Sequence, residues 1–212
     1  MEKIGAIKEK AKKFFSPYYI YCLIIVMINS ALISMQWGLI YYGLIAFQFA
    51  GQYLLMQFLM TLSVLLGFFI SAPIAVGVKS FFLNLVRGEA EMKDILSPFK
   101  KAYDRVIVIM FLRKIKIFLW SFLLVVPGIY KAYEYAMIPY IMAEEPAVSS
   151  KEAFKRSKKL MEGNRLNLFK LQISFIGWYV LAAIPIFAGF MFLSPYVQTA
   201  NAVFYEQIKK GC

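Results

Sequence analysis

The sequence has no histidine among its 212 residues. Histidine is the usual general base at neutral pH and the commonest metal ligand, so its absence excludes serine-histidine and cysteine-histidine catalysis. The cysteines, Cys22 and Cys212, form neither a CxxC pair nor a disulfide framework. No glycine-rich loop of the kind that cradles a phosphate is present. We therefore expect no cofactor, no metal site and no enzymatic activity.

Long polar stretches are scarce as well, because 61% of the residues are hydrophobic and the mean hydropathy is +0.64. Globular proteins contain about 45–50% apolar residues, and a chain of this size cannot bury so much apolar surface without lipid. Apolar stretches long enough to cross a hydrocarbon layer of roughly 30 Å lie at 18–40, 51–78 and 166–193, with a shorter, interrupted one at 115–143. The composition predicts an all-α, polytopic transmembrane helix bundle.

Charge is absent from long parts of the chain. The basic residues, apart from Lys131, gather in four blocks at 1–15, 79–116, 144–170 and 206–212. The connection between the first two predicted spans, 41–50, carries no charge. Lysine and arginine beside membrane spans stay in the cytoplasm. We therefore predict that the basic blocks and both ends of the chain are cytoplasmic and that 41–50 is external.

An even number of crossings must separate any two cytoplasmic blocks, and this requires six helices. A turn at Pro127-Gly128 divides the third helix from the fourth, because proline breaks the helical ladder and glycine permits a reversal. A break near Pro185 or Pro195 divides the fifth from the sixth. The predicted spans lie near 18–40, 51–78, 106–127, 128–143, 166–184 and 186–208.

The third predicted span has few clean apolar residues, because Arg113, Lys114 and Lys116 interrupt it. A short helix that enters the membrane and returns is the alternative for this segment. A topology with four spans is the other alternative, and it would put 151–165 outside.

Three basic segments show helical periodicity, and we expect them to lie in the membrane plane. The first, 1–16, has one apolar face, made by Ile4, Ile7, Ala11 and Phe14. The second begins at residue 97. The third, 150–163, begins with a capping box from Ser149 to Glu152.

Lysines line the polar faces of these segments. We predict that they contact anionic lipid headgroups, at on the order of 1 kcal/mol each, or a soluble partner; simple anchoring of the helices is the alternative. The chain then divides into a basic amphipathic helix, 1–16, and a single membrane-embedded domain, 17–212. The candidate contact residues are Lys8, Lys12, Lys100, Lys101, Lys151, Lys155, Lys158 and Lys159.

Lys131 and Glu134 lie three residues apart on a predicted helix, where they can form an ion pair. Ionisable groups within a membrane suggest function by default, so this pair is the candidate site of a lipid-handling enzyme. The alternative is a surface ion pair at the outer headgroup level. Glu144 and Glu145 precede Pro146, and we expect them to cap the next helix.

Other polar residues within the spans either join helices to one another or line a pathway. Small residues at Gly67, Ser71, Ala75 and Gly77 suit close helix contact and dimerisation into a homo-oligomer. The aromatic residues cluster near span ends, where they form an interfacial belt and not a platform for stacking bases. We expect no nucleic acid partner.

From Leu119-Trp120 onward the sequence carries a set of short motifs: Pro127-Gly128-Ile129, Pro139-Tyr140, Glu145-Pro146, Leu160-Met161-Glu162-Gly163, Phe175-Ile176-Gly177-Trp178, Pro195-Tyr196 and Ala202-Val203-Phe204-Tyr205. In these motifs the sequence resembles a family of small bacterial integral membrane proteins catalogued as domain of unknown function nine-seven-five. More loosely, it is similar to the membrane domain that accompanies some glycerophosphodiester phosphodiesterases, but it has no counterpart of their catalytic domain, so their activity does not transfer. The family resemblance implies a polytopic helical fold in a bacterial plasma membrane, and it implies no activity.

These observations favour a non-enzymatic membrane protein that works by contact. It would be an accessory, protective or scaffolding subunit of a bacterial envelope or transport system, with lipid or a membrane protein on its basic face. A small transporter or channel is the alternative, supported by the polar residues in the spans and the broken helices. A lipid-handling membrane enzyme is the third reading. The expected structural turns are Pro127, Gly128, Pro139, Gly163 and Pro195.

Overall fold

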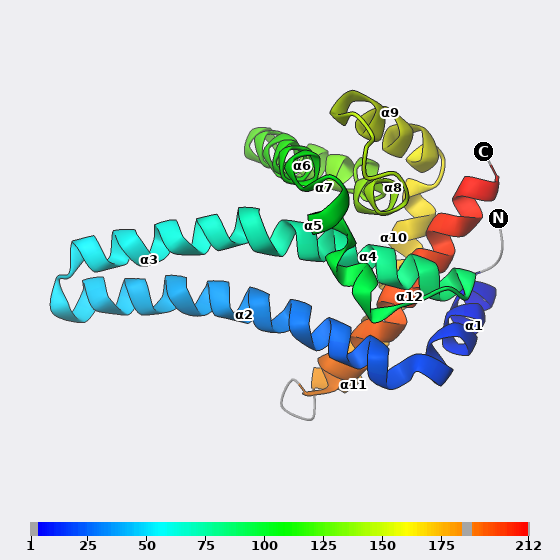
Figure 1. Cartoon of the computed structure of the whole chain (residues 1–212), viewed down its shortest axis with the longest axis horizontal. Helices are drawn as coiled ribbons and strands as arrows, with labels where there is room; N and C mark the ends of the chain where they lie inside the picture. The colour runs from blue at the N-terminus through cyan, green and yellow to red at the C-terminus, as the bar shows by residue number, and fades with distance from the viewer. Residues whose placement is uncertain (1–3, 184–187, 212) are drawn as a thin grey trace.

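The computed structural model describes residues 4–183 and 188–211, except for the side chains of 101, 181–183, 188 and 191. The described residues form helices and turns and no strand, so the prediction of an all-α protein is confirmed. Figure 1 shows a long hairpin of two helices projecting from a body of shorter ones. In chain order the α-helices are α1 (Ile4–Phe15), α2 (Tyr19–Ala50), α3 (Tyr53–Leu66), α4 (Ala72–Arg87), α5 (Ser97–Lys101), α6 (Tyr103–Leu123), α7 (Val125–Glu134), α8 (Ile138–Glu144), α9 (Ser150–Met161), α10 (Arg165–Ile173), α11 (Ile176–Ala183) and α12 (Ala188–Lys210).

The hairpin is formed by α2 and α3 and comes from the uncharged stretch between Lys13 and Lys79. α2 has 32 residues, or about 48 Å at 1.5 Å per residue. Gly51 follows it with φ +63°, a left-handed conformation that glycine adopts without steric cost. The expectation that 41–50 forms a connection between helices is wrong, because no residue before Gly51 stops α2.

Hydrogen bonds join the two arms of the hairpin. The side chain of Gln36 in α2 donates from Nε2 to Ser71 Oγ at 2.6 Å. The backbone carbonyl oxygen of Gln36 accepts from Ser63 Oγ at 3.2 Å. Ser71 ends the π-helical turn Gly67–Ser71, which carries the chain from α3 into α4. Polar side chains within the apolar hairpin thus bind one helix to the other.

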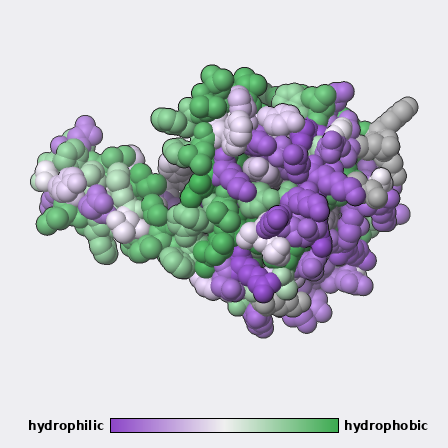
Figure 2. All heavy atoms as spheres, turned by 90° about the horizontal axis from the view of Figure 1, so that it is seen from above, coloured by the Kyte–Doolittle hydropathy of each residue, from purple (hydrophilic) through white to green (hydrophobic). Residues whose placement is uncertain are grey.

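Apolar side chains are exposed along the hairpin. Trp37, Phe49 and Leu54 are 68, 80 and 83% exposed. Two stretches, Ile4–Ala50 and Tyr53–Arg87, are helical, long and apolar enough to cross a membrane. Figure 2 shows hydrophobic residues over most of the hairpin and hydrophilic ones gathered on the body, away from it. An exposed apolar surface of this extent marks contact with lipid or with a partner.

The core of the body surrounds α4, which packs against α8, α12 and the short turn Met92–Leu96. Phe81 and Phe82 of α4 are buried there. The turn can approach only because residue 77 is glycine, since a Cβ on Gly77 would lie 1.9 Å from the carbonyl oxygen of Ile95. The small residue expected to serve helix contact therefore serves a contact within the chain.

The chain reverses between α6 and α7 at Leu124, which has an extended backbone with φ −159° and ψ 145°. The predicted turn at Pro127-Gly128 is therefore wrong by about one helical turn. Pro127 lies in the first turn of α7, where a missing amide hydrogen costs nothing. Gly128 allows the two helices to meet, because a Cβ there would lie 2.1 Å from Ser121 Oγ.

The segment predicted to hold the spans 106–127 and 128–143 does not contain two helices of membrane length. α7 has 10 residues, about 15 Å, against a hydrocarbon layer of roughly 30 Å. Pro139 then opens a separate short helix, α8, in its first turn. The second predicted span of this pair is thus divided in two.

The predicted span 166–184 is also divided, because α10 ends at Ile173 and α11 begins at Ile176. Pro195 is not a break, since it lies inside α12. Thr199 Oγ1 donates to the Pro195 carbonyl oxygen at 2.8 Å, and the neighbouring helices α1, α2 and α11 pack against α12. The alternative break, Pro185, lies outside the described residues.

The apolar faces of α1 and α9 pack against the body. Ile7 and Ala11 of α1 are fully buried, and α1 packs against α12. On α9, Phe154 and Met161 are buried. The second expected in-plane helix, which begins at residue 97, is interrupted at Ala102, which separates α5 from α6. The apolar faces of α1 and α9 are therefore covered by protein, and their lysines other than Lys8 are exposed.

Candidate functional site

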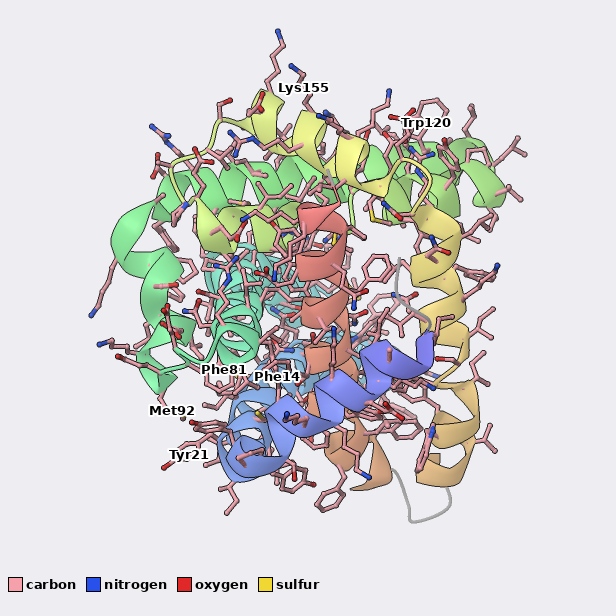
Figure 3. All side chains as sticks on the ribbon, turned by 90° about the vertical axis from the view of Figure 1, so that its right-hand side faces the viewer. Phe14, Tyr21, Phe81, Met92, Trp120 and Lys155 are labelled. Atoms are coloured by element: carbon pink, nitrogen blue, oxygen red, sulfur yellow. The ribbon has the colours of Figure 1, made fainter. Side chains whose placement is uncertain are left out.

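The ends of α1, α4, α8 and α12 meet at the end of the body away from the hairpin, and we call this region the basic end. Figure 3 looks onto it, with α1 crossing in front of α12. α1 and α12 carry basic residues in their last turns, and α4 ends on Arg87. Cations at helix C-termini are favoured by the helix dipole.

Glu144, the last residue of α8, joins three helices at the basic end. Its Oε1 accepts from Lys209 Nζ at 2.7 Å and its Oε2 from the Tyr205 hydroxyl at 2.6 Å, both on α12. Arg87 of α4 donates to Glu144 as well, and its Nε donates to Glu206 at 2.7 Å. This cluster closes the end of the body around one carboxylate.

The charges in the cluster reinforce one another. Burial would raise the pKa of Glu144, but the hydrogen bonds from Lys209, Tyr205 and Arg87 outweigh it, so the pKa lies below its ordinary value. Burial lowers the pKa of Arg87, whereas the bonds to Glu144 and Glu206 raise it above its ordinary value. Both groups are therefore charged at neutral pH, and they form an ion-pair network.

Two hollows flank Arg87. The larger, about 810 Å³, lies between α1, α4 and α12; we call it the basic groove. The smaller, about 580 Å³, lies between α8, α9 and α12; we call it the side hollow. Both fall within the range of roughly 300–1,000 Å³ that is typical of small-ligand sites. The basic groove is lined by Lys10, Lys13, Phe14, Val86, Arg87, Val203, Glu206, Gln207 and Lys210. The side hollow is lined by Arg87, Ile141, Glu144, Glu145, Arg156, Lys159, Leu160, Tyr205 and Lys209.

The two hollows differ in charge. The basic groove has four cationic side chains and one carboxylate, Glu206. The side hollow also has four cationic side chains, but it has two carboxylates, Glu144 and Glu145. Glu145 is bonded in turn to Arg156. The basic groove therefore attracts anions more strongly.

The predicted ion pair forms a second cluster, inside the body. Lys131 Nζ lies 2.9 Å from Glu134 Oε1, and the Glu134 side chain is only 3% exposed. Arg165 of α10 adds a second cation, with Nη2 3.3 Å from Glu134 Oε2. The Lys131 ammonium also lies 5.4 Å from the centre of the Trp120 ring. Two cations thus neutralise one buried carboxylate and bind α7 to α10.

This cluster lies beside α9. The hydroxyl of Ser157 on α9 donates to the backbone carbonyl oxygen of Glu134 at 2.8 Å. α9 belongs to the basic block 144–170, so the pair lies next to that block. Among residues 4–183 and 188–211, no three Cys, Asp or Glu side chains gather as metal ligands.

Comparison with known families is informative for the second half of the chain. Residues 122–211 match the model of a family described as Protein of unknown function (DUF975). This part of the chain resembles DUF975. No curated protein and no solved structure matches the chain. The looser similarity to glycerophosphodiester phosphodiesterase membrane domains therefore stays a prediction.

The DUF975 match covers part of the candidate site. It contains the helices α7 to α12, and with them the Glu134 cluster and Glu144, the last residue of α8. α1 and α4, which form two walls of the basic groove, lie before it. The side hollow is thus almost wholly a feature of the DUF975 region, whereas the basic groove joins that region to the first half of the chain.

The predicted contact lysines have different environments. Lys8 donates to the carbonyl oxygen of Ser174 at 2.7 Å and lies 4.4 Å from the centre of the Phe175 ring, so it holds α1 to the body. Burial lowers the pKa of its ammonium group. The side chain of Lys101 is outside the described residues. The exposed candidates are Lys12, Lys100, Lys151, Lys155, Lys158 and Lys159.

Sequence reasoning missed the residues that complete both clusters. Arg165 follows the helix end at Gly163, where φ is +73°, and nothing local links it to Glu134. Arg87 is separated from Glu144 by 57 positions in the chain. The available signal was its position just before Gly88, a helix-ending glycine with φ +83°, since that places a cation at a helix C-terminus.

Proposed function

We propose that this protein is a non-enzymatic integral membrane protein of the bacterial plasma membrane that works by contact, as an accessory or scaffolding subunit. The observation that carries the proposal is the separation of the apolar hairpin from the basic end. One part of the molecule suits lipid hydrocarbon, and the other suits an anionic surface at the cytoplasmic side.

The α2–α3 hairpin supports membrane insertion. It carries no charged residue, its apolar side chains are exposed, and α2 is longer than a bilayer requires. Its arms satisfy their backbone hydrogen bonds within each helix, which lipid demands. The hairpin then gives two crossings, with Gly51 at the external turn.

The α6–α7 pair suits a re-entrant hairpin better than two crossings. Its tip is apolar and exposed: Phe122, Leu123, Leu124, Val125 and Val126 are 65–83% exposed. Its base carries Arg113 on α6 and Lys131 on α7. We propose that the tip enters the hydrocarbon from the cytoplasmic side and that α10–α11 and α12 supply the remaining crossings.

The internal ion pairs support a structural role for the buried charges. Glu134 and Glu144 each contact at least two cationic groups. A carboxylate whose oxygens are bonded to cations from two helices holds those helices together. This structural role accounts for the buried charges without the lipid-handling enzyme.

The proposal is tested by purifying the tagged protein in mild detergent and identifying all retained proteins and lipids by mass spectrometry. An unrelated tagged membrane protein of similar size from the same cells is the control. We expect a stoichiometric protein, or enriched anionic lipid, on this chain only. Substrate-dependent flux in vesicles with neither retained would contradict the proposal and favour the transporter.

A further inference from the structure

The basic groove combines a cationic rim with an apolar floor. Lys13 on α1 and Lys210 on α12 line the groove, and both are exposed. Among the described residues, no carboxylate forms an ion pair with either. The one acid in the lining, Glu206, is already bonded to Arg87 at 2.7 Å. Within the described part of the chain, Lys13 and Lys210 therefore give the rim a positive charge that no ion pair offsets.

The floor of the groove is made by Phe14, Val86 and Val203, one from each of the three helices that line the groove. A free inorganic anion gains nothing from an apolar floor, whereas an amphiphile gains from both surfaces. This combination favours a phospholipid, whose phosphate is anionic and whose glycerol carries acyl chains.

The position of the groove agrees with such a ligand. α1, which forms one wall, is followed directly by the turn Ser16–Tyr18 and then by α2. The groove thus adjoins the helix that leaves the body as the hairpin. In the proposed topology the start of α2 lies at the cytoplasmic face of the membrane.

We propose that the basic groove binds the headgroup of an anionic phospholipid, with Lys13 and Lys210 contacting the phosphate and Phe14 and Val203 packing beneath the glycerol. The proposal rests on membrane insertion of the hairpin and deepens the proposed contact function by naming one ligand class. The side hollow is the weaker candidate, because two carboxylates offset its cations.

The test uses the full-length protein in a neutral detergent. Native mass spectrometry measures the dissociation constant for phosphatidylglycerol, for phosphatidylcholine with the same acyl chains, and for phosphatidylglycerol in the presence of an equal concentration of inorganic phosphate. The groove variant is Lys13→Gln with Lys210→Gln. The control variant is Lys155→Gln with Lys158→Gln, which removes the same charge from α9 at positions that line neither hollow. Figure 3 shows Lys155 pointing away from the body.

We expect the wild type to bind phosphatidylglycerol more tightly than phosphatidylcholine. The groove variant should weaken this binding about 25-fold, since each of its two cations near an anionic lipid contributes roughly fivefold. The control variant should change it less than about threefold, because its lysines are outside the groove. Inorganic phosphate should not compete. All variants should keep the wild-type melting temperature; if the groove variant does not, Lys13→Gln alone should weaken binding about fivefold.

Three results would contradict the proposal that the basic groove binds an anionic phospholipid. Equal weakening in both variants would mean diffuse attraction to the basic end. Competition by inorganic phosphate would mean an ion site without lipid. No preference for phosphatidylglycerol would mean no anionic lipid site. None of these decides the contact function, because a stoichiometric protein retained in mild detergent would still support it.

Discussion

Replacement of Glu144 by glutamine probes the cluster that closes the basic end. The substitution would keep the shape of the side chain but would remove the charge that Lys209, Tyr205 and Arg87 share. Hydrogen bonds to charged groups contribute about 1.5–3 kcal/mol each. The Glu144 side chain is 16% exposed, and the amide oxygen of glutamine can still accept hydrogen bonds. We therefore expect a loss of about 2–3 kcal/mol in the free energy of unfolding.

The assay is the apparent melting temperature of the purified protein in detergent. A domain of 150–250 residues shifts by about 2–4 °C per kcal/mol, so Glu144→Gln should lower the melting temperature by roughly 4–12 °C. Glu145→Gln is the matched control. Glu145 is bonded to Arg156, but their side chains are 51 and 45% exposed, and exposed pairs contribute about 0–1 kcal/mol.

The stabilisation by Glu144 depends on pH, and the direction of this dependence follows from the shift in the pKa of its carboxyl group. The folded protein lowers the pKa of Glu144 below the ordinary 4.5. Its stabilisation is therefore fully present above the ordinary pKa and is lost as the pH falls through the folded-state pKa. The difference between wild type and Glu144→Gln should shrink on acidification. If Glu144→Gln melted within about 1 °C of Glu145→Gln at neutral pH, the cluster would not stabilise the basic end.

Two further predictions concern the body. Glu134→Gln leaves two cations without their carboxylate. We expect a loss of about 3–5 kcal/mol in the free energy of unfolding, as for other broken buried pairs, and the same melting assay measures it. A variant as stable as the wild type would show that the buried network contributes nothing to stability. Gly128→Ala would put a Cβ 2.1 Å from Ser121 Oγ, and the resulting separation of α6 from α7 should destabilise the protein by about 1–3 kcal/mol. Gly177→Ala, whose Cβ would meet nothing within 4 Å, is the control and should be neutral or stabilising by up to about 1 kcal/mol; equal losses in both variants would contradict the close contact.

The hairpin was predictable because its determinants are local. Sixty-five consecutive uncharged residues, 14–78, predict two apolar helices whatever surrounds them. The turn was placed too early, since an uncharged connection and a continuing helix look alike in 41–50. Only the left-handed backbone at Gly51 marks where α2 ends.

The amphipathic helices were predictable in pattern but not in partner. Ile7 and Ala11 lie on one face of α1 at helical spacing, and the same spacing serves lipid or protein equally well. The structure covers this face with α12. Similarly, the α6–α7 reversal was expected at a proline and a glycine, whereas Gly128 is needed for packing against Ser121.

The candidate site was the least predictable part. The basic groove combines α1, α4 and α12, whose lining residues lie as far apart in the chain as Lys10 and Lys210. Only the tertiary fold brings them together. The Lys131–Glu134 pair was found because its members are one helical turn apart, while Arg165, which completes it, was not.

The central claim is that the hairpin crosses the membrane and that the basic end stays on the cytoplasmic side. The most direct test is labelling of single cysteines with an impermeant thiol reagent in intact cells, after Cys22 and Cys212 have been replaced by serine. Gln52→Cys, at the turn of the hairpin, and Lys155→Cys, on α9, form the pair. We predict that the first is labelled from outside and that the second reacts only after the cells are permeabilised. Labelling of both from outside, or of Lys155→Cys alone, would contradict this account.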